Sequence, residues 1–86
     1  MTPRQIELAR HALGLRPGCL VSYRNHFVAG SGHVDYPDWM LMVDAGNATR
    51  IENEHLPAGL VLFKLTRAGA EAALLPGDRL DPEDWP

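Results

Sequence analysis

The spacing of apolar and polar residues predicts three helices and two or three strands. Thr2, followed by Pro3 and Gln5, forms a capping box of the kind that begins a helix. Apolar residues then recur at helical spacing until Gly14, which suits a left-handed helix end. These apolar positions are Ile6, Ala9 and Leu13. The sequence therefore predicts a first helix that ends near Leu13.

A second helix is predicted from Asp35, which is expected to cap its first turn, to a stop at Gly46. One helix face carries Trp39, Met42 and Val43, and Tyr36 and Met40 adjoin it. Five consecutive apolar residues, 39–43, cannot all face one core. We therefore expect either an exposed interface patch or a helix enclosed on both sides.

Two strands are predicted at 47–52 and 60–65, joined by a turn segment over 53–59. Thr66 is expected to cap a third helix that continues to Pro76-Gly77, with an apolar stripe. The stripe consists of Ala68, Ala72 and Leu75. Residues 19–28 are predicted to be extended, and 30–33 to form a loop.

Length and composition indicate one small cytoplasmic domain. The chain has 86 residues, 45% of them hydrophobic, which is ordinary for a globular protein. No apolar run approaches the roughly 18 residues needed to cross a membrane, and the first residues do not resemble a secretory signal. The single cysteine, Cys19, is expected to be a small buried residue.

Charge divides the chain more clearly than the net value of −3 suggests. Residues 1–34 are basic, 35–54 are acidic, and 78–86 form an acidic, proline-containing tail after a domain over 1–77. Trp85 in this tail is either a docking anchor or, as we prefer, a side chain that folds back over the domain.

Residues 38–75 resemble the C-terminal half of winged-helix regulators of the MarR and PadR type. The resemblance rests on an apolar helix, Ala-Gly, and then Leu-Phe-x-Leu-Thr-x-Ala-Gly-x-x-Ala-Ala-Leu. It implies a winged-helix fold that reads DNA with a helix and a wing. The matching helix carries three aspartates, Asp35, Asp38 and Asp44, and no basic residue. Because phosphate contacts need cations, the usual DNA-binding surface is disfavoured here.

A second resemblance, to small uncharacterised proteins of tailed phages and prophages, covers more of the chain. It rests on 22–30, Gly32-His33, 35–39, Met42-Val43 and the Leu-Phe-x-Leu-Thr element. Proteins of that class are often inhibitors or adaptors of one host protein, including antagonists of host defence. The resemblance implies a host protein as the partner.

The densest polar and aromatic cluster is Tyr23-Arg24-Asn25-His26, which precedes a glycine loop with His33. It suits a recognition patch, since it offers a stacking ring, a guanidinium and an amide. The alternative is structural: Tyr23 and Phe27 pack in the core while the polar residues cap backbone groups.

Neither metal binding nor catalysis is favoured by the sequence. Zinc ligand types occur at Cys19, His26, His33 and Asp35, but their spacing matches no strong zinc pattern. No serine or cysteine has the context of an activated nucleophile, and no phosphate-binding loop is present. We expect no cofactor.

Taken together, the residues predict an α+β domain of winged-helix type, with three helices and a two- or three-stranded antiparallel sheet. The expected function is non-enzymatic binding of a host protein, and a homodimer is an alternative assembly. The expected binding residues are Tyr23, Arg24, Asn25, His26, His33, Trp39 and Met40. The alternative is a DNA-binding regulator that uses Arg4, Arg10, Arg16 and Arg24.

Overall fold

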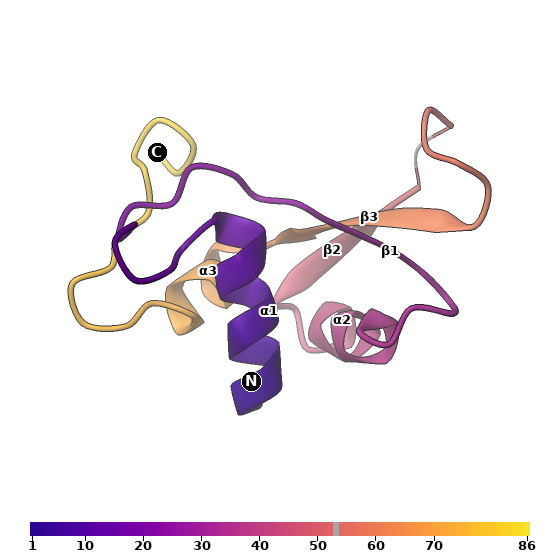
Figure 1. The fold of residues 1–86 in the computed structure, drawn as a ribbon, viewed down its shortest axis with the longest axis horizontal. Helices are drawn as coiled ribbons and strands as arrows, with labels where there is room; N and C mark the ends of the chain where they lie inside the picture. The colour runs from indigo at the N-terminus through magenta and orange to yellow at the C-terminus, as the bar shows by residue number, and fades with distance from the viewer. Residues whose placement is uncertain (53) are drawn as a thin grey trace.

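The computed structural model describes residues 1–52 and 54–86, which form three helices and a three-stranded antiparallel sheet (Figure 1). This confirms the predicted α+β class. In chain order the elements are α1 (Pro3–Leu13), β1 (Phe27–Gly30), α2 (Tyr36–Asp44), β2 (Ala48–Ile51), β3 (Leu60–Leu65) and α3 (Arg67–Ala72). The sheet order is β1-β3-β2, so β3 is the central strand.

The sheet has one face against the helices and one face without them. Phe27 of β1 lies opposite Phe63 of β3, and Val28 lies opposite Leu62. Since side chains alternate along a strand, the two pairs belong to opposite faces. Figure 1 shows α1 and α2 on one side of the sheet. The other side, here called the open face, carries Val28, Thr49, Ile51, Leu62 and Lys64.

The core is built around Trp39 of α2, whose side chain has no exposed surface. Its ring stacks on Phe63 with a centroid distance of 5.5 Å and lies 5.1 Å from the ring of Phe27. Leu8 and Leu13 of α1 complete this packing. Truncating so large a buried side chain to alanine typically costs about 3 to 5 kcal/mol. Trp39 therefore joins α2 to the inner face of the sheet.

Helix α1 begins and ends as predicted, whereas the start of α2 differs. The Thr2 side chain and Gln5 form the reciprocal capping box, and Gly14 takes the left-handed conformation at φ 80°. Asp35 occupies the N-cap position of α2 but makes no side-chain cap hydrogen bond. Its backbone is already helical, and its carboxylate accepts a hydrogen bond from Arg4 instead. The predicted capping role of Asp35 is thus wrong.

Helix α3 is capped by Thr66 as predicted, but it ends at Ala72 rather than at Pro76. Its buried face carries Gly69, Ala70 and Ala73, so the predicted stripe of Ala68, Ala72 and Leu75 lies on the exposed side. The reason is a close contact between backbones. A Cβ at Gly69 would lie 1.9 Å from the carbonyl oxygen of Asn47, so only glycine lets α3 approach the backbone just before β2 this closely.

Two predictions for the segment before α2 were partly wrong. The strand begins at Phe27 and includes Gly30, so the predicted loop starts one residue later, and most of 19–26 is irregular. The amides of Tyr23 and His26 donate to carbonyl groups at the C-terminal end of α1, which replaces strand pairing there. Cys19 is half-buried rather than part of the core.

The predicted turn over 53–59 is described from residue 54 onward, and residue 53 lies outside the described residues. Residues 54–59 form turns that lead into β3, where the Leu60 amide donates to the Pro57 carbonyl at 3.1 Å. In Figure 1 this connection extends beyond the end of the sheet, on the side opposite the C-terminus.

The C-terminal segment folds back on the domain, as preferred from the sequence. The Arg79 carbonyl accepts from the Ser22 amide at 3.0 Å, and the Asp81 amide donates to Ser22 Oγ at 2.9 Å. Leu80 and Trp85 pack against the core.

A partly buried ion pair ties α1 to the start of this segment. Arg10 donates to the Asp78 carboxylate, and their side chains are 14% and 1% exposed. The hydrogen bond from Arg10, and then the one from the Leu75 amide, lower the pKa of Asp78. A carboxylate with a lowered pKa stabilises the fold above its unfolded pKa of about 3.9. That stabilisation is lost as the pH falls through the lower, folded-state pKa.

We expect Gly69→Ala to lower the free energy of unfolding by about 3 kcal/mol, because the added methyl group meets the Asn47 backbone. Gly32→Ala is the matched control: its Cβ would meet nothing within 4 Å, and the change should stay within about 0.5 kcal/mol. Urea unfolding measures both. Equal stabilities of the two variants would contradict the close contact of α3 with the Asn47 backbone.

We expect Asp78→Asn to destabilise the protein by about 3 kcal/mol at neutral pH, because it leaves Arg10 without its carboxylate. As the pH falls from about 3.9 through the lowered folded-state pKa of Asp78, the wild-type carboxylate loses its stabilising contribution, so the difference between the two proteins should shrink. Urea unfolding over a pH series measures it. A difference that stays constant down to pH 2 would contradict a stabilising Asp78 carboxylate.

Candidate functional site

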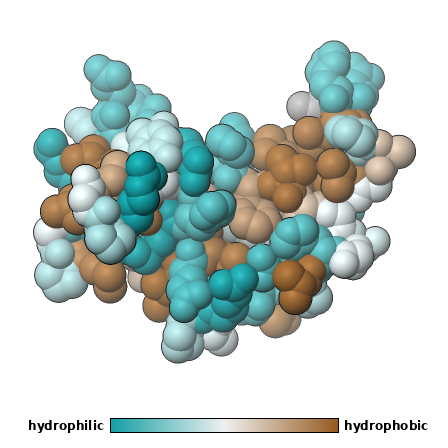
Figure 2. Space-filling model, in the orientation of Figure 1, coloured by the Kyte–Doolittle hydropathy of each residue, from teal (hydrophilic) through white to brown (hydrophobic). Residues whose placement is uncertain are grey.

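A hollow of about 710 Å³ lies over one end of the open face, and we call it the sheet groove. It is lined by Tyr23, Arg24, Asn25, His26, Thr49, Leu62, Lys64, Leu65, Asp84 and Trp85. Four of these are the predicted cluster 23–26, and the others come from β2, β3 and the C-terminal segment. Figure 2 shows hydrophobic surface over the region of β1 and β3, beside the more polar groove end. The structure thus brings the predicted cluster to an open part of the sheet.

Tyr23 stands at the edge of the sheet groove with its side chain about half exposed, at 50%. The Arg24 guanidinium lies 5.2 Å from its ring centroid and that of Arg16 lies at 5.9 Å, both at cation–π distance. Arg16 also donates to the phenol oxygen at 3.2 Å. A Cβ at Gly14 would lie 2.2 Å from this ring, so glycine is needed there both for the helix end and for the tyrosine.

Asn25 has a structural role at the wall of the groove. Its amide nitrogen donates to the Leu65 carbonyl at 3.1 Å, and its side-chain oxygen accepts from the Leu65 amide at 2.8 Å. The β1–β3 register, in which Phe27 faces Phe63, extends to place Asn25 opposite Leu65. The side chain therefore supplies the two hydrogen bonds that a strand backbone would otherwise supply.

Arg24 also has a structural contact. Its Nε and Nη2 donate to the His11 carbonyl at 3.2 and 2.7 Å, which satisfies an acceptor in the last turn of α1. The structural alternative for the cluster is thus correct for Asn25 and in part for Arg24. Tyr23 does not pack into the core, and the His26 side chain is exposed.

Cations without a carboxylate partner gather at this end of the molecule. The chain has eight lysines and arginines. Arg4, Arg10, Arg50 and Arg67 each pair with an aspartate or glutamate. Within the described residues, Arg16, Arg24, Lys64 and Arg79 form no ion pair, and the first three lie in or beside the sheet groove. The groove therefore carries positive charge that the described part of the chain does not neutralise.

The C-terminal segment contributes Asp84 and Trp85 to the groove. Arg67 of α3 lies 5.9 Å from the Trp85 ring centroid and donates to the Pro86 carbonyl, which holds the segment in place. The Trp85 indole nitrogen is buried and has no acceptor among the described residues. A buried donor without a partner costs about 1 to 3 kcal/mol. The tryptophan is therefore docked, but its polar atom is not satisfied.

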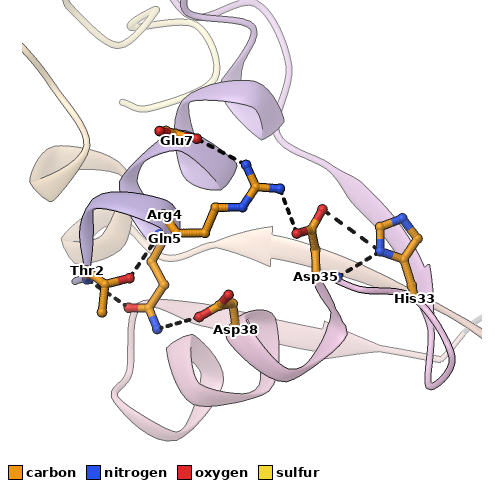
Figure 3. Close-up of polar contacts among 7 residues, drawn as sticks. All are labelled: Thr2, Arg4, Gln5, Glu7, His33, Asp35 and Asp38. Atoms are coloured by element: carbon orange, nitrogen blue, oxygen red, sulfur yellow. Dashed lines mark hydrogen bonds and ion pairs between the residues drawn. The ribbon is translucent and has the colours of Figure 1, made fainter.

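His33 belongs to a second polar cluster, away from the sheet groove (Figure 3). Arg4 donates to Glu7 at 3.0 Å and to Asp35 at 2.7 Å, and Asp35 first and Glu7 second raise the pKa of Arg4. The ring Nδ1 of His33 accepts from the Asp35 amide at 3.0 Å, so the neutral ring carries its proton on Nε2. In Figure 3 these side chains point toward one another across the gap between α1 and α2. The cluster joins the two helices.

Trp39 and Met40 do not join the groove. Trp39 was predicted as a binding residue and is instead wholly buried in the core, because its ring completes the stack with Phe63. Met40 is half-buried and packs against the core. The exposed apolar residue of α2 is Leu41, which is 58% exposed. Trp39 is therefore removed from the set of surface residues.

Five residues of the groove lining were not among the predicted site residues: Thr49, Leu62, Lys64, Leu65 and Asp84. Trp85 was considered as a docking anchor but was not assigned to this site. One signal was present in β3, which reads Leu-Val-Leu-Phe-Lys-Leu and is apolar on both faces. A strand with one solvated face normally alternates apolar and polar residues. The apolar residues on the second face of β3 indicated that this face, too, packs against other residues.

Two of the four arginines expected to bind DNA are engaged elsewhere. Arg4 pairs with Glu7 and Asp35, and Arg10 pairs with Asp78. Only Arg16 and Arg24 lack a carboxylate within the described ranges. The alternative DNA-binding surface therefore keeps two of the four arginines that were predicted for it.

Over residues 1–52 and 54–86, no three histidine, cysteine, aspartate or glutamate side chains are grouped so that they could hold a metal ion. His26 and His33 lie in different hollows. In that same part of the chain, no helix is both long and apolar enough to cross a membrane.

No family model, curated protein or solved structure matches this chain. The resemblances to winged-helix regulators and to small phage proteins therefore stay predictions. What is established is the α+β fold and the placement of the sheet groove on it.

We expect Asn25→Ala to lower the free energy of unfolding by about 2 kcal/mol, because it leaves the Leu65 amide and carbonyl without partners. His26→Ala, one residue further on and exposed, should change it by less than about 0.5 kcal/mol. Thermal and urea unfolding measure both. An Asn25→Ala variant as stable as His26→Ala would show that the Leu65 contacts contribute nothing to stability.

Proposed function

We propose that this protein is a non-enzymatic binding domain that recognises another protein through the sheet groove. The observation that carries the proposal is the combination of unpaired cations with exposed aromatic and apolar surface at one place. Lys64, Arg24 and the half-exposed Tyr23 meet there. Tyrosine and arginine are the residues that most often dominate binding energy in protein interfaces.

The apolar part of this surface continues along the open face. Val28 is 38% exposed, and Leu62 and Ile51 beside it are half-buried. The register places Leu62 between the other two, opposite Val28 on one side and Ile51 on the other. An apolar strip with charged residues at one end fits a protein interface, in which a dry centre is bordered by a polar rim.

The resemblance to phage proteins supports a finer version of the proposal. In that version the partner is a protein of the infected host cell, and this domain regulates or inhibits it. A host defence component is one such target. The support is analogy with a class of proteins, whereas the support for the binding surface is the lining and the charge of the sheet groove.

The second candidate is a DNA-binding regulator. Arg16, Arg24 and Lys64 favour it, since they lie together and have no carboxylate partner among the described residues. Arg4, Arg10 and the aspartates of α2 oppose it, because the two arginines are paired and the aspartates repel phosphates. Salt-dependent retardation of a duplex that Lys64→Glu abolishes would favour this candidate.

We expect Lys64→Glu to weaken capture of a partner protein from cell lysate at least tenfold, because it reverses a groove charge. Arg79→Glu makes the same change of charge at an exposed residue outside the groove lining, and it should change capture less than twofold. Quantitative pull-down with both variants gives the comparison, and unfolding curves verify that both are folded. Equal effects of the two variants would mean that overall charge, and not the sheet groove, governs binding.

A further inference from the structure

We propose that the sheet groove takes an acidic peptide segment with an aromatic residue, and that residues 81–86 of this chain occupy part of that place in cis. The inference rests on the proposed function, because it names the kind of partner for the same site.

The first observation is the charge of the site. Arg24 and Lys64 line the groove and Arg16 lies against Tyr23, and none of the three meets a carboxylate within the described chain. By contrast, four other arginines each form an ion pair with an aspartate or glutamate: Arg4, Arg10, Arg50 and Arg67. Complementary charge is what selects one partner surface over another. The groove therefore selects for acidic segments.

The second observation is the segment of this chain that already borders the groove. The C-terminal segment reads Asp81-Pro-Glu-Asp-Trp-Pro86, which is acidic with one aromatic residue. Its Trp85 lies in the groove lining and under the Arg67 guanidinium. The chain thus contains an example of the chemistry that the groove accepts.

The third observation is that this segment leaves polar and charged groups of the groove without partners. Asp84 lines the groove, yet it forms no ion pair with Lys64 or Arg24 within the described residues. The indole nitrogen of Trp85 has no acceptor there either. A segment from another protein that places a carboxylate at Lys64 pairs a cation that the C-terminal segment leaves unpaired, and displacement of Trp85 returns its indole nitrogen to water.

The C-terminal segment then acts as a competitor of the partner. It is tethered to the domain, so its effective concentration at the groove is high even if its contacts are weak. The tether begins after α3 at Pro76-Gly77, and the Ser22 contacts hold Arg79 and Asp81 independently of Trp85. Trp85 and Asp84 can therefore leave the groove while the rest of the segment stays docked. Removing the Trp85 side chain should make the groove more accessible.

The test uses the full-length protein and a labelled synthetic peptide with the sequence of residues 78–86. Fluorescence anisotropy at low salt should show at least tenfold tighter binding to Trp85→Ala than to the wild type. Adding Lys64→Glu to Trp85→Ala should reduce binding at least tenfold, whereas adding Arg79→Glu should change it less than twofold. A peptide with alanine in place of its tryptophan, or with amides in place of its carboxylates, should bind at least tenfold more weakly.

If Trp85→Ala does not fold, Arg67→Ala takes its place, because it removes the contacts that hold Trp85 and Pro86 and leaves the core intact. Equal peptide binding by the wild type and the opened variant would overturn the proposal. So would stronger binding of a single-stranded oligonucleotide than of the peptide, or a dimer formed by exchange of C-terminal segments.

The two proposals fail in different ways. If Lys64→Glu abolishes partner capture but the acidic peptide does not bind, the groove is the binding site and the occupant class is wrong. If Lys64→Glu leaves both partner capture and peptide binding unchanged, the sheet groove itself is not the site and both proposals are wrong.

Discussion

Stacking of Trp39 on Phe63, together with its contact with the ring of Phe27, places α2 against the inner face of the sheet and leaves the outer face without a helix. Most of the apolar surface of α1 and α2 is used on that inner face, where Leu8, Leu13 and Met42 are buried. A small domain has no further helix to cover the second face. Its open face is covered in part by the segment 23–26 and by the C-terminal residues, and the sheet groove lies between them.

The polar contacts around this arrangement are mostly structural. Asn25 continues the pairing of β3 beyond the start of β1, and Arg24 satisfies the last turn of α1. Arg4 and Arg10 join α1 to α2 and to the C-terminal segment through carboxylates. Among the described residues, Arg16, Arg24 and Lys64 have no carboxylate partner. Because these three cations lie in or beside the sheet groove, they distinguish it from the rest of the surface.

The sequence predicted the elements of the fold well where the signals are local. The Thr2 capping box, Gly14, the two strands of the hairpin and the Thr66 cap were all confirmed, because each depends on neighbours in the chain. The predictions failed where distant contacts decide. The Asp35 carboxylate accepts a hydrogen bond from Arg4 instead of capping α2. Helix α3 buries the face that carries Gly69, because the Asn47 backbone lies against it.

The site was predictable in part for the same reason. The cluster 23–26 stood out by composition, but neither the structural role of Asn25 nor the burial of Trp39 could be read without knowing which strand or ring each one meets. Lys64 and Trp85 became site residues only through the sheet order and the returning C-terminal segment. These are long-range relations, and hydrophobic periodicity does not encode them.

The central claim is that the open face, at its groove end, is where another protein binds. Backbone amide chemical shifts, recorded by NMR while a captured partner is added to the folded domain, test it most directly. The account predicts that the largest changes occur at Tyr23–His26, Thr49 and Lys64, with little change in α2. Changes concentrated instead around Val34 and Leu41, on the opposite side of the molecule's core, would contradict it.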